Sequence, residues 1–249
     1  MLDWLRSLTT QSRALSEPQR QRLARVLQHR QKLGDRLGEM GAEARWVVAD
    51  VETSGLNVLS DRLIAIGAVA VVQGAVQVAD SFEVVLRQEQ VSSDANILVH
   101  RITHDQQQSG LEPAEALLRF WEFVGDSPLV GYHAEFDRIM LERAGRHFLG
   151  DRESSEWLDL AMFAPALVRE GELAKSPRQT KSHARPLDWW LAKFQIEVRK
   201  RHHAAADALG TAQLLCALIA RLEEPERSSA TVGWLHEQCR NYRWLLERS

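Results

Sequence analysis

The sequence predicts a mixed α/β domain with helical extensions at both ends. Short apolar runs fit buried strands, longer segments carry apolar residues at helical spacing, and the two kinds alternate in the second half of the chain. We divide the 249 residues into an N-terminal helical extension over 1–43, a main domain over 44–222, and a linker with a C-terminal helix over 223–249. A hydrophobic content of 45% is ordinary for a packed globular protein.

The first half of the chain supplies one helix and three strands. Residues 1–43 are polar and have a helical pattern, with Ser16 as a candidate N-cap. The main domain begins at 46–50, where a short apolar run ending in an acid predicts a buried strand. Two runs rich in Val, Ile and Ala are separated by a turn sequence and predict antiparallel strands at 63–72 and 76–86.

The second half alternates helices and strands, which favours a mixed sheet covered by helices. The predicted elements, in chain order, are a helix at 112–124, a strand at 128–132, a helix at 134–148, a strand at 156–160, and helices at 187–194 and 204–222. After a charged, Pro-containing linker, the last 20 residues predict a short helix that packs on the domain or on a partner.

Composition favours a soluble cytoplasmic protein. Two cysteines without metal-type spacing fit a reduced compartment, and the first residues lack the apolar core of a secretory signal. The longest uncharged stretch, 63–79, contains Gly and Gln, so we expect no membrane span. A net charge of −3 excludes a generally basic nucleic-acid coat, but 175–203 holds eight Lys or Arg against two acids, a balance of +6. Such a run is either a solvated loop or a guide for a phosphate backbone.

The first chemical signal is a pair of acids at the end of the first predicted strand. Asp50 and Glu52 are two residues apart, and alternation along a strand places both carboxylates on one side. Carboxylate oxygens in that arrangement suit hard divalent cations such as Mg²⁺ or Mn²⁺. The pair by itself is a weak signal, because acids at strand ends are more often simply solvated.

Two further segments carry acids at positions where secondary structure changes. Asp137 lies in the first turn of a predicted helix that follows an apolar strand. An acid is also common there without any function, because its charge interacts favourably with the helix N-terminus. Asp207 follows His202 by five residues, with small alanines between them. Five residues turn a helix by about 500°, so we expect His202 on the preceding loop, reaching to the same site as Asp207.

Together, in this order, the segments resemble the DEDDh (DnaQ-like) 3′–5′ exonucleases, which include the proofreading epsilon subunit of bacterial DNA polymerase III, ribonuclease T and oligoribonuclease. The resemblance covers about residues 46–222. It rests on the patterns D-x-E-T-(S/T)-G-L from Asp50, F-D at Asp137, and H-x-A-x-x-D-A from His202. Residues 99–103 and 187–191 add weaker likeness to the His-Gly-Ile-Thr segment and the Leu-Asp helix of these enzymes.

The resemblance implies an RNase H-like fold, a mixed five-stranded sheet flanked by helices, and hydrolysis assisted by two divalent cations, Mg²⁺ or Mn²⁺. It implies that Asp50, Glu52 and Asp207 hold one cation, that Asp50 bridges to the second, and that Asp137 supports the second. His202 would take the proton of the attacking water as general base. The four carboxylates would repel one another without metal, so we expect partial protonation or poor order in that state.

The resemblance also suggests residues for the terminal nucleotide. Thr53, Gly55 and Leu56 follow the first acid pair, with Leu56 as an apolar wedge, although Gly55 fits equally well as a plain turn glycine. Weaker candidates for the same pocket are His100, Ile102 and Phe136.

The chain departs from the family at positions that flank the substrate. Tyr132-His133 stand where His-Asn is usual, and Arg101 stands where Gly is usual. These positions bear on sugar and base preference and leave the hydrolytic set complete. We expect the set to act on a nucleic acid with a single-stranded 3′ end, DNA rather than RNA, in proofreading or repair. The expected partner, through the terminal helices, is a DNA polymerase or another protein. The alternatives are an RNA-trimming exoribonuclease of the ribonuclease T type and a partner-binding module with a vestigial nuclease site.

Overall fold

The computed structural model describes residues 15–31, 44–152, 154–168, 185–198, 201–222 and 230–246. Its centre is a five-stranded sheet in the order β3-β2-β1-β4-β5. The strands are β1 (Trp46–Thr53), β2 (Leu63–Val72), β3 (Ala75–Val85), β4 (Leu129–Gly131) and β5 (Trp157–Asp159). The first three are antiparallel neighbours, whereas β4 and β5 run parallel to β1. The mixed five-stranded sheet predicted from the sequence is confirmed.

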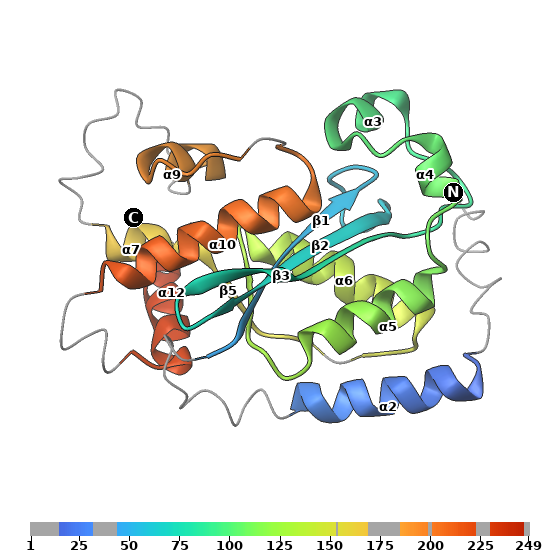
Figure 1. Ribbon diagram of the computed structural model, residues 1–249, viewed down its shortest axis with the longest axis horizontal. Helices are drawn as coiled ribbons and strands as arrows, with labels where there is room; N and C mark the ends of the chain where they lie inside the picture. The colour runs from blue at the N-terminus through green and yellow to red at the C-terminus, as the bar shows by residue number, and fades with distance from the viewer. Residues whose placement is uncertain are drawn as a thin grey trace.

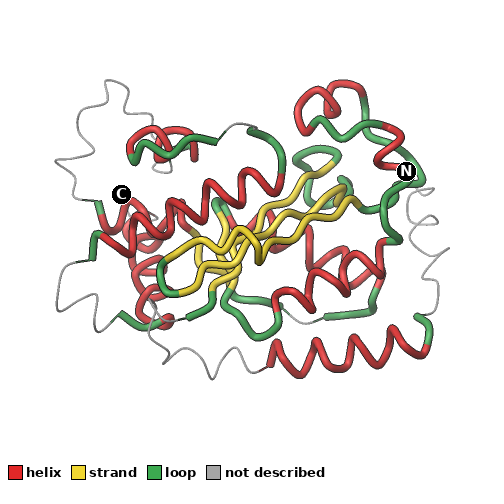
Figure 2. The backbone as a smooth tube through the Cα atoms, in the orientation of Figure 1, coloured by secondary structure: helices red, strands yellow, loops and turns green. Residues whose placement is uncertain are grey.

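Helices cover both faces of this sheet (Figure 1). The longest, α10 (Ala204–Ala220), lies across β1, β2 and β3 on one face, where α7 (Leu160–Leu167), α9 (Leu187–Lys193) and α12 (Val232–Leu246) share a core with it. The other face packs against α5 (Pro113–Val124) and α6 (Ala134–Phe148), with α2 (Glu17–Gln31) outside α5. Figure 2 shows the strands enclosed between these two helical layers.

Alternation along β1 assigns its side chains to the two cores. Trp46 and Val48 belong to the core on the α10 side, while Val47, Ala49 and Val51 belong to the core on the α5 and α6 side. The same parity turns the next even-numbered side chains, those of the acid pair, toward α10. A strand that is buried on both faces has a continuous apolar sequence, so β1 and β2 could be predicted from the sequence.

Three short helices depart from the predicted elements. α3 (Asp94–His100) and α4 (His104–Gln108) connect β3 to α5, and α7 starts directly after β5. Each is too short to show a helical period, and α4 is set instead by a capping box in which Thr103 and Gln106 exchange hydrogen bonds. The predicted strand at 156–160 accordingly ends earlier, at Asp159, whose carboxylate caps α7.

The terminal helices contact the domain in different ways. α2 is capped by Ser16, as predicted, and Arg22 joins it to α5 through Glu115 and Glu122 at 2.7 Å each. α12 packs on α7 and β5. The remainder of the predicted 1–43 extension and the linker at 223–229 lie outside the described residues. Within the described part of the chain, no helix combines the length and apolarity that a membrane span requires.

Candidate active site

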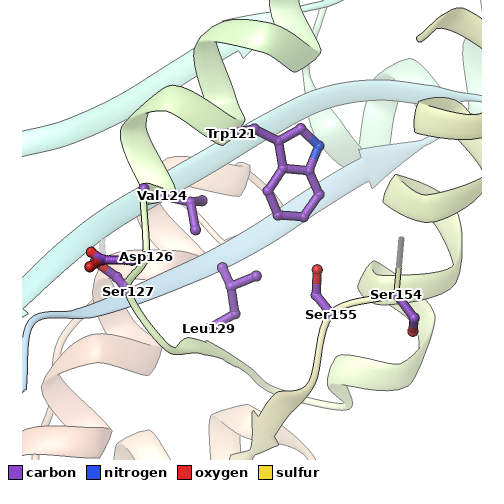
Figure 3. A pocket seen from close by; sticks show the side chains of 8 residues that line it. Trp121, Val124, Asp126, Ser127, Leu129, Ser154 and Ser155 are labelled. Carbon is purple, nitrogen blue, oxygen red and sulfur yellow. The ribbon is translucent and has the colours of Figure 1, made fainter. Parts of the chain in front are cut away.

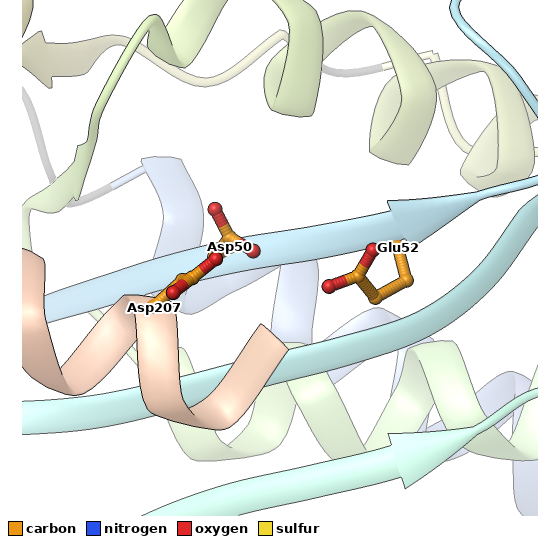
Figure 4. Close-up of side chains that lie close together, drawn as sticks. All are labelled: Asp50, Glu52 and Asp207. Atoms are coloured by element: carbon orange, nitrogen blue, oxygen red, sulfur yellow. The ribbon is translucent and has the colours of Figure 1, made fainter. Parts of the chain in front are cut away.

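Three of the predicted acids meet where β1 faces the start of α10. Oxygens of Asp50, Glu52 and Asp207 all lie within 4.8 Å of one another. Figure 4 shows Asp50 and Glu52 projecting from β1 on the same side, with Asp207 of α10 beside Asp50. Alternation along the strand places the first two together, as predicted, and the packing of α10 supplies the third.

Gly67 allows α10 to come this close to the sheet. It lies opposite Asp50 in the register of β1 and β2, and its missing side chain leaves room for the first turn of the helix. A Cβ built on Gly67 would stand 2.1 Å from the backbone nitrogen of Ala205, far inside van der Waals contact. A glycine in a strand interior often marks such a close backbone approach. From the sequence, Gly67 is only a glycine that interrupts the uncharged stretch 63–79, and no local pattern signals this close approach.

Asp137 approaches the site from α6, on the other side of β1. Its Oδ1 accepts the backbone N–H of Val51 at 3.0 Å, which fixes the carboxylate beside the strand segment that carries the acid pair. The side chain is buried, and among the neighbouring charges that of Asp137 does most to raise the pKa of Asp50. Asp137 therefore neighbours the site but stands outside the tight group of three carboxylates.

The electrostatics of the site show an excess of negative charge. Burial raises the pKa of Asp50 well above its usual range, and the neighbouring carboxylates add to this effect. Burial and the charge of Asp207 raise the pKa of Glu52 to about 7, while burial raises the pKa of Asp137 to about 8. Arg201, which binds Asp207, offsets only part of this charge. Clustered carboxylate oxygens with an excess of negative charge are the ligand set that a hard divalent cation requires, so the residues fit the predicted cofactor.

The two adjacent histidines point to different parts of the fold. His202 lies on the loop before α10, as predicted; its side chain is exposed and its backbone N–H donates to Asp207 Oδ2 at 3.0 Å. His203 instead places Nε2 3.2 Å from Glu83 on the edge strand β3. Of the two, His202 is the one bound to an acid of the cluster, through its backbone N–H.

Comparison with known proteins agrees with this geometry. Residues 47–215 match the RNase T family, described as exonucleases. The chain belongs to this exonuclease family. The match covers more than half of the chain and includes β1 and most of α10, the two elements that carry the three clustered acids. The resemblance to DnaQ-like exonucleases seen in the motifs is confirmed.

Individual relatives extend the comparison. The chain is 29% identical over 187 residues to a PolC-type DNA polymerase III of Oceanobacillus iheyensis, covering 75% of this chain and 12% of that polymerase. It also resembles E. coli Exonuclease I bound to a dT13 oligonucleotide, with a TM-score of 0.60 and 19% identity over 72% of this chain and 42% of that one. Exonuclease X in complex with 5′ overhanging duplex DNA gives a TM-score of 0.53 and 18% identity over 78% of this chain and 99% of that one.

The loop after β1 in this exonuclease domain is organised by Asp61. Its carboxylate accepts the hydroxyl of Ser54 at 2.9 Å and the backbone N–H of Asn57 at 2.8 Å. A Cβ on Gly55 would stand 2.5 Å from Asp61 Oδ2, so a larger residue there would displace the carboxylate that organises this loop. Leu56, on the same loop, is 87% exposed.

The other predicted pocket residues differ in accessibility. Thr53 donates its hydroxyl to the carbonyl of Gly55 at 2.7 Å, and Phe136 is half-buried against the α6 core. His100 is buried: Nδ1 accepts the N–H of Ile102 at 3.0 Å, and Nε2 lies 3.2 Å from Ser92 Oγ. Ile102 is buried as well. The structure therefore places His100 and Ile102 in the interior rather than at the surface beside the acids.

Backbone geometry accounts for the glycine and asparagine that the family has at two of the positions where this chain departs. Arg101 and His133 both have left-handed backbones, with φ of 60° and 57°. Glycine adopts this conformation without strain, and asparagine and histidine more readily than most residues. The N–H of His133 donates to Asp159 at 3.0 Å, and the buried Tyr132 donates its hydroxyl to the carbonyl of Arg185. Tyr132 therefore anchors the segment before α9 rather than facing the acids.

A small, partly open cavity lies away from this site. It has a volume of about 20 Å³ and is lined by Trp121, Leu129 and Ser155 among others (Figure 3). Leu129 starts β4, whereas the acids sit toward the opposite end of the parallel strand β1. Its volume suits a single water molecule. The cavity is therefore no candidate for substrate binding.

Proposed function

We propose that this chain is a metal-dependent 3′–5′ exonuclease that releases 5′-mononucleotides from a single-stranded DNA end. The observation that carries the proposal is the group of three carboxylates within 4.8 Å, inside a domain of the exonuclease family. Asp50, Glu52 and Asp207 would hold divalent cations, Mg²⁺ or Mn²⁺, with Asp137 as support for the second. When bound, such cations polarise a phosphoryl oxygen and acidify water.

The protein's own groups have separate roles in this proposal. His202, exposed on its loop and held through its backbone N–H by Asp207, would accept the proton of the attacking water. Thr53, Gly55 and Leu56 would contact the terminal nucleotide, with the Leu56 side chain against the base. All four predicted acids are present, which argues against a vestigial site.

DNA is favoured as substrate by two similarities. One relative is a DNA polymerase III, and two solved structures of the same fold hold DNA. These similarities concern other proteins, and the chain spans only 12% of that polymerase. We propose proofreading or repair in the cytoplasm as the setting, with RNA trimming as the alternative.

The experiment is digestion of oligonucleotides labelled at the 5′ end, comparing single-stranded DNA, a duplex with a 3′ overhang, and RNA. We expect a ladder shortened from the 3′ end in Mg²⁺ or Mn²⁺ and no products in a chelator. Immediate release of the labelled 5′ nucleotide, or equal cleavage in the chelator, would reject the proposal. Faster digestion of RNA would favour the trimming alternative.

Variants test the assigned roles. We expect Asp50→Asn to abolish cleavage and His202→Ala to lower kcat by about 10²- to 10⁴-fold, the usual contribution of a general base. His203→Ala and Asp94→Asn are matched controls, since His203 pairs with Glu83 and Asp94 is 92% exposed on α3. Both controls should retain activity, and full activity in either test variant would remove that residue from the mechanism.

A further inference from the structure

Arg201 joins the acid cluster to α9. Its Nε lies 2.5 Å from Asp188 Oδ1, and its Nη1 donates to Asp207 Oδ1. Asp188 is 67% exposed, whereas Asp207 is only 9% exposed. One edge of the guanidinium therefore binds a surface carboxylate, and the other enters the group of clustered acids.

Both oxygens of Asp207 are engaged in this arrangement. Oδ2 accepts the N–H of His202, and Oδ1 accepts Arg201. If a divalent cation also bound Oδ1, that oxygen would contact two positive groups, the cation and the guanidinium. The two would repel each other, and the repulsion is stronger where the site is partly shielded from water. The cation and Arg201 therefore compete for Asp207, while the contact with Asp188 lies outside the acid cluster and is unaffected by that competition.

We infer that Arg201 exchanges partners: it neutralises Asp207 in the metal-free protein and turns to the substrate's phosphate when a divalent cation takes that oxygen. The phosphate step rests on the proposed function. Asp188 keeps Nε in place, so the released Nη groups stay beside the acids, where the scissile phosphodiester must lie. A guanidinium is suited to this because its planar fork binds phosphate oxygens in pairs and it stays charged.

If Arg201 only formed a structural ion pair between α9 and α10, its removal would change the metal affinity in the opposite direction. Removing a structural pair would loosen the start of α10 and weaken the binding of both metal and nucleic acid. If Arg201 exchanges partners, its removal changes the two affinities in opposite directions. Metal binding tightens because the competitor is gone, and nucleic-acid binding weakens because a phosphate contact is lost. The sign of the change in metal affinity distinguishes these roles.

The test is calorimetric titration of the full chain with Mn²⁺ in the absence of nucleic acid, followed by anisotropy of a labelled DNA oligonucleotide in Ca²⁺. We expect Arg201→Gln to bind Mn²⁺ at least about fivefold more tightly and the oligonucleotide about fivefold more weakly. Lys193→Gln, which removes a cation that lies over Trp189, is the matched control and should change neither affinity. Weaker or unchanged Mn²⁺ binding, or unchanged oligonucleotide binding, in Arg201→Gln would overturn the inference.

A second variant keeps the test decisive if Arg201→Gln does not fold. Arg201→Lys retains the charge but loses the planar fork, so Mn²⁺ affinity should stay near that of the wild type while oligonucleotide binding weakens. Wild-type oligonucleotide affinity in Arg201→Lys would overturn the phosphate contact. Neither measurement requires hydrolysis. A chain that binds Mn²⁺ and DNA without cleaving the DNA would refute the proposed function, but the exchange of Arg201 could still be measured.

Discussion

At the scale of single residues, the site brings together buried carboxylates whose ionised forms are destabilised. Asp50, Glu52 and Asp137 all have raised pKa values, with burial as the main cause. An acid whose pKa is higher in the folded state binds protons more readily folded than unfolded. Its contribution is therefore most favourable below the unfolded pKa and is lost as the pH rises through the folded value. Here the window runs from about pH 4 to pH 8, as the values of about 7 for Glu52 and about 8 for Asp137 indicate.

This predicts that the metal-free protein loses stability as the pH rises from 5 to 8.5, by on the order of 2 kcal/mol in the free energy of unfolding. Denaturant unfolding in a chelator across this range measures it. Asp137→Asn should flatten the profile, because the amide can still accept the N–H of Val51 but carries no charge. Mn²⁺ should restore stability at the alkaline end. A wild-type profile no steeper than that of Asp137→Asn would contradict the prediction.

The sequence predicts site residues that belong to a motif with fixed spacing. It does not predict those whose position depends on how the elements pack. Asp50, Glu52 and Asp207 were expected together and are together. Arg201 was visible only as part of a basic run, because its pairing depends on how α9 lies against α10. The sequence around His100 predicts a place near the substrate, yet His100 ends α3 with its ring turned inward, where it contacts Ser92 and Ile102.

At the scale of elements, periodicity identified the strands and long helices to within a few residues. β2 and α6 have the predicted bounds, because an apolar run and an amphipathic repeat are both local signals. α3, α4 and α7 were missed because helices this short are defined by caps and tertiary contacts rather than by a period. The distance between α10 and the sheet was equally out of reach, since it depends on one strand glycine facing one helix turn.

That glycine yields a prediction for the element it positions. Gly67→Ala should push the first turn of α10 away from β2, destabilise the protein by about 1–3 kcal/mol and lower nuclease activity far more than the stability loss explains. The measurements are thermal unfolding and cleavage well below the melting temperature. Gly145→Ala is the control: its Cβ would meet only the Asp151 side chain, at an ordinary contact distance of 3.8 Å, so stability should stay equal or rise by up to about 1 kcal/mol. Wild-type activity in Gly67→Ala would show that α10 tolerates displacement.

At the scale of the whole molecule, α12 belongs to the same core as the sheet. Val232 and Leu235 are buried with residues of α7, α9 and α10, whereas Trp244 near the end of the helix is 51% exposed. Deleting 229–249 to test for a partner would therefore remove part of the core along with any binding surface. A loss of binding in that deletion could not be assigned to either cause.

Point substitutions on α12 separate folding from partner binding. Leu235→Ala should destabilise the protein by about 2–5 kcal/mol, since it empties a fully packed position. Trp244→Ala should cost less stability than Leu235→Ala, because Trp244 is 51% exposed. If a polymerase docks on this helix, Trp244→Ala should weaken its capture while the protein stays folded and keeps its exonuclease activity. Strong destabilisation by Trp244→Ala would instead assign the whole helix to the fold and direct the search for a partner surface elsewhere.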